Sequence, residues 1–312
     1  MKLRSNIFLR GILTHCYQRT VDGYLIFYTI EDFLLFYTLL CTIAPKYRIR
    51  IYKVTLMPDH YHLVLTAECF EDLAHFIAEL TSRFTKAQNV ELQRKGALFE
   101  GPFGFSLKKQ EKDARSAFIY ADNNPVERKL CERAEQYRWT FLAYAQSDHP
   151  FSRKICRSHE RKAFRQMLDG VDRLHANRQP TSYRFLQYQF SRLTAEEKPC
   201  AVDYIISKYR VMDFDAVIKF FGSYERMLMA DHTTTGSEHD LKEVFVGRDD
   251  KVYRQLSILL PRMTGIRDLH EVLRLPMEKR RSLFHSIRCS TSLPAVQIAK
   301  YLRIPRASSR RN

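Results

Sequence analysis

The stretch VTLMPDHYHLVLTA, residues 54–67, constrains the fold most, because it places two histidines one residue apart in an otherwise apolar run. Its β-branched and aromatic residues predict a strand. Alternate residues of a strand face the same side, so His60 and His62 project together while Tyr61 projects to the opposite face. Such a pair can hold one divalent metal ion and leave positions for a substrate oxygen. Two polar histidines on a sheet surface would give the same pattern, so the spacing alone leaves both interpretations open.

The neighbouring segments predict a small α+β domain. Residues 9–27 alternate loosely and contain Asp22-Gly23, which predicts a strand, a turn and a returning strand. We further expect a helix over 31–47, strands on both sides of Pro58-Asp59, a helix over about 71–95, a bent strand within 97–110 and a helix over about 111–124 that stops before Pro125. This order indicates a ferredoxin-like layout, with a small antiparallel or mixed sheet that carries helices.

Beyond residue 150 the sequence changes to long polar stretches with a helical pattern and few strand signals. We therefore predict a first domain over 1–150, a helical connector over 151–200 and a helical C-terminal domain over 201–312. The polar stretch HTTTGSEHD, residues 232–240, is typical of a loop inside that last domain.

The charge of the chain indicates its partner. A formal net charge of +16 and an isoelectric point near 9.6 favour a polyanion, and nucleic acid is the first candidate. No apolar run reaches the roughly 18 to 20 residues that a membrane span needs, so we expect no membrane partner. The N-terminus lacks the pattern of a signal peptide, and seven cysteines without a C-x-x-C pair fit reduced thiols, so we expect a cytoplasmic protein.

Four blocks of the first 145 residues resemble, in order, the REP-associated tyrosine transposases of the HUH single-tyrosine superfamily. The block MPDHYHLVL resembles the metal-binding signature of that superfamily, in which a hydrophobic residue separates two histidines. The other three blocks are similar to the family's opening, middle and closing segments, namely THCYQRTVDGYLIFYTIEDFLLFYTLL (14–40), GALFEGPFGFSLK (96–108) and FIYADNNPVERKLCERAEQYRWTFLAY (118–144). The resemblance implies an HUH fold for this region and a bacterial, nucleoid-associated protein.

The resemblance also implies a role for each matching residue. Tyr120 falls on the family's nucleophilic tyrosine, and His60 and His62 fall on its metal ligands, for Mg²⁺ or Mn²⁺. Asn124 occupies the place of a further polar ligand, and because it lies four residues after Tyr120 both would share one helix face. A position just before Pro125 could instead lie in a frayed helix end.

Three positions depart from the family pattern. Asp59 stands where asparagine is common, and could add negative charge near the metal or simply form the same turn. Pro102 replaces an arginine and Lys129 replaces a glycine, so any phosphate contact near Pro102 must come from Lys108, Lys109 or elsewhere. These changes indicate a divergent branch.

The last 41 residues, from Val272 onward, hold ten Lys or Arg and one Glu, a net charge of +9. Residues 290–312 within them resemble a helix-turn-helix unit, with Arg303 in place of the usual turn glycine and a short second helix. A solvated basic tail is the alternative interpretation. The residues that we expect to contact DNA phosphates are Arg83, Lys86, Lys108, Lys109, Arg303, Arg306, Arg310 and Arg311.

The function predicted is that of a metal-dependent single-strand DNA endonuclease and strand transferase, a transposase acting on hairpin-containing DNA through a 5′-phosphotyrosine. Phe103 and Phe105 could stack on exposed bases. Two alternatives stay open: a domesticated DNA-binding regulator without catalysis, and an HUH endonuclease of the plasmid-nicking type. The sequence leaves open the DNA target, the role of 151–290, the general base, and whether the protein is a monomer or a homodimer.

Overall fold

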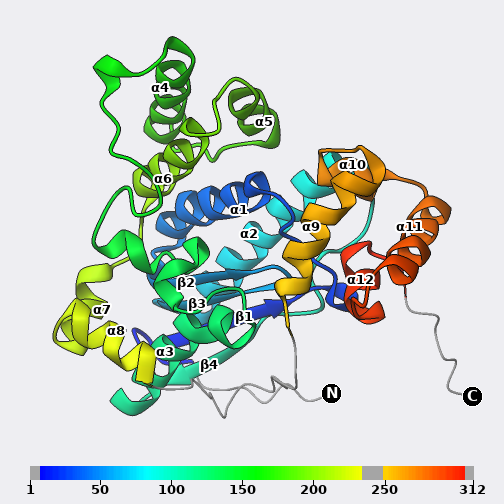
Figure 1. The fold of residues 1–312 in the computed structure, drawn as a ribbon. Coiled ribbons are helices and arrows are strands. Elements are labelled where there is room, and N and C mark those ends of the chain that lie inside the picture. Colours follow the sequence, from blue (N-terminus) through cyan, green and yellow to red (C-terminus); the bar gives the residue numbers. More distant parts are fainter. Residues whose placement is uncertain (1–7, 234–248, 306–312) are drawn as a thin grey trace, which may run out of the picture.

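The computed structural model describes residues 8–233 and 249–305, and its centre is a four-stranded antiparallel sheet (Figure 1). The strands lie in the order β2-β3-β1-β4. Their bounds are Leu13–Arg19 for β1, Arg50–Met57 for β2, His60–Thr66 for β3 and Gly104–Lys108 for β4. With helices on the sheet and a largely helical remainder, the predicted α+β fold class is confirmed.

Helices cover both faces of this sheet (Figure 1). Helices α1 (Ile30–Ile43) and α2 (Phe70–Glu91) lie on one face, where Tyr61 of β3 contacts Phe36 of α1 and Phe99. Helix α3 (Glu111–Glu127) lies on the other face, against β2, β3 and β4. Alternation along β3 therefore sends Tyr61 into the main core and sends both histidines towards α3.

The returning strand predicted after Asp22-Gly23 is wrong. A short 3-10 turn, Val21–Gly23, follows β1, and the chain then runs without a strand to α1. The N–H groups of Ile26 and Phe27 donate to the carbonyl of Pro58, and that of Tyr28 donates to the Asp32 carboxylate. Because these backbone N–H groups already donate to partners outside the sheet, residues 24–28 do not need to pair with β1 to satisfy them.

The prediction that the third helix stops before Pro125 is also wrong, because α3 continues to Glu127. Proline has no N–H, so the carbonyl of Ala121, four residues earlier, loses its helical donor. The hydroxyl of Thr55 in β2 donates to that carbonyl over 2.7 Å instead. The neighbouring strand thus satisfies the group that Pro125 leaves unpaired, and Asn124 lies within a helix and is fully buried.

Nine α-helices follow in the described part of the chain. They are α4 (Lys162–Ala176), α5 (Tyr183–Ser191), α6 (Glu197–Tyr209), α7 (Phe214–Phe221), α8 (Tyr224–Thr233), α9 (Lys251–Thr264), α10 (Leu269–Arg274), α11 (Met277–Ser290) and α12 (Ala295–Tyr301).

The expected connector region packs on the first domain. Buried side chains of α4 to α6 share one hydrophobic cluster with α1, α2 and the sheet. Hydrogen bonds cross the expected boundary as well, from the Tyr37 hydroxyl to the Ile206 carbonyl over 3.0 Å and from Tyr144 to Asp203 over 2.7 Å. The domain limits stay a prediction, and most of the expected loop 232–240 lies outside the described residues.

The C-terminal helices form a second cluster of buried apolar side chains. It joins α9, α10, α11 and α12 to Leu25, Tyr28 and Leu92 of the first domain. Helix α12 agrees with the first helix of the expected helix-turn-helix unit, and Arg303 after it has a positive φ of 49°, the backbone conformation that a turn glycine provides. The second helix would fall on 306–312, outside the described residues, so the unit stays a prediction.

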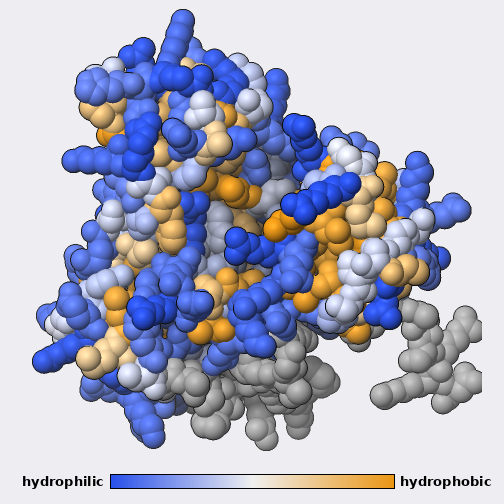
Figure 2. Space-filling view, viewed as in Figure 1, coloured by the Kyte–Doolittle hydropathy of each residue, from blue (hydrophilic) through white to orange (hydrophobic). Residues whose placement is uncertain are grey.

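The surface in Figure 2 is hydrophilic over α4 and α5, whereas hydrophobic residues gather where α9 lies in Figure 1. Ile258 of α9 is one of the exposed large hydrophobic residues. Over 8–233 and 249–305, none of the helices combines the length and the hydrophobicity that crossing a bilayer requires.

Candidate active site on the face beneath α3

The first histidine of the pair is held at one nitrogen and unpartnered at the other. His60 begins β3 and is buried, with 3% of its surface exposed. Its Nδ1 lies 2.6 Å from Oδ1 of Asp59. Its Nε2 is buried and has no hydrogen-bond partner among the described residues. A carboxylate on the far nitrogen fixes the ring and its tautomer, as is usual for histidines that bind metals.

The second histidine has the same arrangement with a different partner. Nδ1 of His62 lies 3.0 Å from Nε2 of His15 in the neighbouring strand β1. Nε2 of His62 is buried and lacks a partner among the described residues. The rings of His60 and His62 have centroids 4.8 Å apart and stand nearly perpendicular, at 89°. The prediction that the two imidazoles converge is therefore confirmed in this geometry.

Helix α3 places the predicted nucleophile and the predicted amide ligand on the same face of the sheet. The ring of Tyr120 meets the ring of His62 edge to face, with centroids 5.3 Å apart, and lies 5.6 Å from that of His15. Asn124, one turn further along α3, is fully buried, and both its Oδ1 and its Nδ2 lack partners within the described residues. A buried amide without partners is costly, which marks this position as one that a ligand could satisfy.

The charges around the site favour neutral imidazole at His62. Burial, followed by the positive charge of His60, His15 and Arg128, holds the pKa of His62 well below its usual range. Burial opposes ionisation of Asp59, but His60 and Arg128 outweigh it and hold the pKa of that carboxyl below its usual range. Arg128 in turn lies 3.2 Å from the Asp250 carboxylate. Neutral imidazole is the form that binds a metal ion.

The donor set therefore fits a divalent ion at His60, His62 and Asn124. Two imidazole nitrogens and one amide oxygen can coordinate a divalent ion, and all three atoms are buried and lack hydrogen-bond partners among the described residues.

A second cluster, Glu91, Asp268 and His270, also gathers potential ligand atoms within 4.8 Å of one another. Its groups are already satisfied. Nε2 of His270 donates to Asp32 over 3.1 Å, and its Nδ1 lies 3.5 Å from Glu91. We interpret this cluster as an ion-pair network and not as a metal centre.

A buried charge cluster lies beside the site, between β2, α3 and α8. Lys53 and Asp122 form an ion pair, and both are 1% exposed. The Asp231 carboxyl is also buried and is the second acid near this single lysine. Burial, followed by the charge of Asp122, raises the pKa of Asp231 to about 9.

The predicted DNA contacts fall into three groups. Arg83, Lys86 and Lys109 are exposed, although Arg83 lies 3.4 Å from Glu79. Arg306, Arg310 and Arg311 lie outside the described residues. The other two, Lys108 and Arg303, are 5% and 8% exposed, and their contact with DNA stays a prediction.

The reasons for burial differ between these two residues. Lys108 ends β4, and its Nζ lies 3.0 Å from the Ser106 hydroxyl. Arg303 reaches back into the first domain, where its guanidinium donates to the Leu25 carbonyl and to Gln88, each over 2.8 Å.

Comparison with known proteins gave a family match within the first 150 residues. Residues 26–108 match the family described as "Transposase IS200 like". This segment is similar to the IS200-like transposases. The resemblance to tyrosine transposases that the sequence indicated is confirmed for residues 26–108. This segment contains His60 and His62 and ends before Tyr120 and Asn124. Curated proteins gave no match.

Among solved structures, one similar chain is described as "Structure of the REP associates tyrosine transposase bound to a REP hairpin". The identity is 15% and the TM-score is 0.41, with 47% of this chain and 87% of that chain covered.

Sequence reasoning missed His15 and Arg128 as partners of the site. His15 stands in the strand THCYQR, inside the block that resembles the family's opening, so the signal for it was present. Arg128 follows the NPVE block, but only the packing of α3 shows that it lies 3.8 Å from Asp59.

Proposed function

We propose that the protein is a metal-dependent single-strand DNA endonuclease and strand transferase that cleaves hairpin-containing DNA through a 5′-phosphotyrosine. The observation that carries this proposal is the arrangement of His60 and His62. Each is held at Nδ1, each leaves a buried Nε2 without a partner among the described residues, and the ring of Tyr120 packs against that of His62. Similarity of residues 26–108 to the IS200-like transposases supports it.

In this proposal His60, His62 and Asn124 hold Mg²⁺ or Mn²⁺, and Asp59 and His15 position the two imidazoles. The bound ion would supply positive charge to a non-bridging oxygen of the scissile phosphate. For both Nε2 atoms to act as ligands, each Nδ1 must carry the proton, so His60 donates to Asp59 and His62 donates to His15.

Tyr120 would be the nucleophile. The phenol gives up its proton as its oxygen bonds to phosphorus, the bond from phosphorus to the 3′ oxygen breaks, and that oxygen takes up a proton and leaves as a 3′ hydroxyl. Because the phosphotyrosine keeps the energy of the original ester, a second 3′ hydroxyl can reverse the step without ATP. The phenol is only 1% exposed, so the proposal requires the site to open when DNA binds.

The exposed cations Arg83, Lys86 and Lys109 would contact the DNA backbone, with Arg306, Arg310 and Arg311 as further predicted contacts. Phe103 and Phe105 are partly exposed and form an aromatic group with Phe70, and this group could stack on unpaired bases.

The test is a covalent-adduct assay with labelled single-stranded hairpins taken from DNA that flanks the gene, in the presence of Mg²⁺ or Mn²⁺. We expect an adduct with the unaltered protein and none with Tyr120→Phe, while hairpin binding stays within about twofold. The matched control is Tyr17→Phe, because the Tyr17 ring also lies near His62, at 6.5 Å. Loss of adduct in Tyr17→Phe and its retention in Tyr120→Phe would reassign the nucleophile.

The burial of Tyr120 also favours a second candidate, a regulator that binds DNA and no longer cleaves it. Such a protein would bind the hairpin and would form no adduct with either metal ion. An HUH endonuclease of the plasmid-nicking type is the third candidate, and it would cut a strand without resealing it to a second 3′ hydroxyl.

A further inference from the structure

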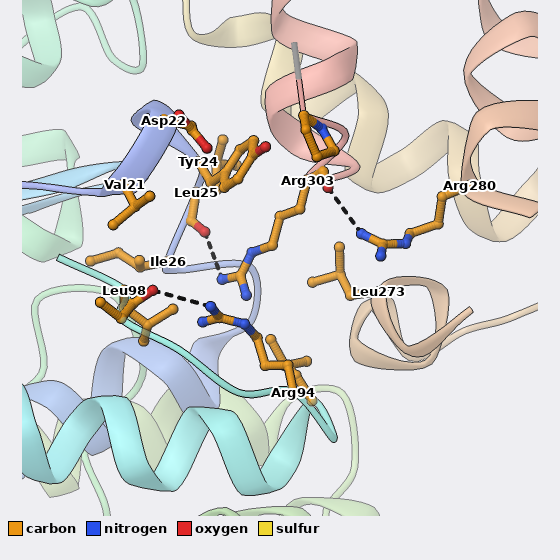
Figure 3. Close-up of a pocket in the computed structure, with 13 residues that line it drawn as sticks. Val21, Asp22, Tyr24, Leu25, Ile26, Arg94, Leu98, Leu273, Arg280 and Arg303 are labelled. Atoms are coloured by element: carbon orange, nitrogen blue, oxygen red, sulfur yellow. Dashed lines mark hydrogen bonds between the residues drawn. The ribbon is translucent and has the colours of Figure 1, made fainter. Parts of the chain in front are cut away.

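Three arginines from three separate segments line one cavity of about 260 Å³ (Figure 3). Arg94 follows the C-terminus of α2, Arg280 belongs to α11, and Arg303 follows α12. The loop after β1 forms the opposite wall, with Asp22 and Leu25. The cavity therefore lies where the C-terminal helices meet the first domain, and it is separate from the histidine site.

Arg303 is the best-defined group of this cavity, because it is 8% exposed and firmly held. Its Nε lies 3.1 Å from the Tyr28 hydroxyl, and one terminal nitrogen donates to Leu25 and Gln88. The other terminal nitrogen, Nη1, is buried and has no partner among the described residues. Figure 3 shows the guanidinium groups of Arg303 and Arg94 pointing towards one another across the cavity.

The positive charge of this cavity is not balanced by ion pairs. Within 8–233 and 249–305, none of Arg94, Arg280 and Arg303 forms an ion pair with a carboxylate, and their hydrogen bonds go to carbonyls and neutral side chains. Nη1 of Arg94 is likewise buried without a partner in that part of the chain. Burial, followed by the charge of Arg303, lowers the pKa of Arg94. A bound anion would supply the missing charge and hydrogen-bond acceptors.

We infer that this cavity is a binding site for the phosphate group of a nucleotide, either free or at a strand end. Guanidinium groups present planar pairs of donors that match phosphate oxygens, and three of them converge here. The apolar walls, which include Leu25, Ile26 and Leu98, leave room beside the phosphate for a sugar or a base. This inference does not depend on cleavage at Tyr120.

The chemistry also predicts a consequence for the fold. Arg94 and Leu25 belong to the first domain, and Arg280 and Arg303 belong to the C-terminal helices. A phosphate bound between them would link the two parts and raise the stability of their contact.

The test uses the full chain, with inorganic phosphate, deoxyadenosine monophosphate, and a short single-stranded oligonucleotide with or without a 5′-phosphate. Binding is measured by calorimetry and by the melting temperature, with chloride at matched ionic strength as the reference. We expect the nucleoside monophosphate to bind at least as tightly as phosphate. Stronger binding of the 5′-phosphorylated strand than of the 5′-hydroxyl strand would assign the ligand to a strand end, whereas equal binding would assign it to free nucleotides.

Arg94→Gln is the principal variant, because Arg94 bonds only to carbonyls of its own loop and its loss should leave the fold intact. We expect about tenfold weaker phosphate binding. Asp22→Asn should tighten binding severalfold, since it removes the carboxylate from the cavity wall, and asparagine tolerates the positive φ of 56° at this position. The control is Arg184→Gln, which removes the same charge from an exposed position on α5.

Three results would overturn the inference. The first is no phosphate effect beyond that of chloride, and the second is equal weakening by Arg94→Gln and Arg184→Gln. The third is binding of inorganic phosphate with exclusion of the nucleoside monophosphate, which would remove the assignment to nucleotides.

Discussion

The ion pair between Asp32 and His270 should make the attachment of the C-terminal helices depend on pH. His270 of α10 donates to Asp32 of α1 over 3.1 Å, and the two side chains are 1% and 0% exposed. Burial alone would lower the pKa of His270, but Asp32 and Glu91 raise it to about 10. The pKa of Asp32 is lowered, because His270, Tyr183 and Thr29 together outweigh its burial.

The sign of the pH dependence follows from these shifts. The raised pKa of His270 means that its contribution is complete below the unfolded value of 6.5 and is lost as the pH rises towards about 10. The lowered pKa of Asp32 means that its contribution is present above 3.8 and is lost at lower pH. Because one pKa unit corresponds to about 1.4 kcal/mol, the upper limit for His270 is about 5 kcal/mol.

The assay is urea unfolding at pH values from 6 to 10, with His270→Gln compared with the unaltered protein. At pH 6 we expect the variant to lose about 3 kcal/mol of unfolding free energy, because it leaves the buried Asp32 charge without its partner. The difference should shrink steadily towards pH 10. His285→Gln, at an exposed position of α11, is the control and should change little at any pH. A loss from His270→Gln that stays constant between pH 6 and 10 would refute the reasoning.

Other parts of the molecule give four shorter predictions. Replacing His60 and His62 together by Gln should abolish the rise in melting temperature that Mn²⁺ produces in the unaltered protein; a retained rise would place the ion elsewhere. The pKa of Asp231 is raised to about 9 in the folded protein, so between pH 3.8 and 9 the carboxyl ionises only in the unfolded state and the protein loses stability as the pH rises. Asp231→Asn should therefore raise the melting temperature at pH 8 but not at pH 4. Thr55→Val should cost about 1 to 3 kcal/mol in urea unfolding, because a carbonyl of α3 loses its replacement donor. Deletion of 306–312 should reduce the slope of log affinity against log salt by about 0.7 to 0.9 for each DNA phosphate that these residues neutralise, and an unchanged slope would exclude them from DNA binding.

The secondary structure was predictable where the pattern of the sequence is local. The two strands around Pro58-Asp59 and the helices α1 and α2 follow from apolar periodicity and from acidic residues at helix starts, and all four are confirmed. The predicted end of the third helix was wrong because a residue distant in the sequence supplies the missing hydrogen-bond donor. The hydroxyl of Thr55 lets α3 continue through Pro125, and nothing in the sequence near that proline indicates this donor.

The sequence by itself determined that His60 and His62 share one face of a strand, because side chains alternate along an extended chain whatever surrounds it. It also indicated that Tyr120 and Asn124 share one helix face. Only the tertiary structure decided that α3 covers that face, that His15 and Asp59 hold the two imidazoles, and that Arg303 is buried in the first domain. These contacts join residues that are far apart along the chain or depend on how elements pack, and a periodic pattern carries information only about the element in which it lies.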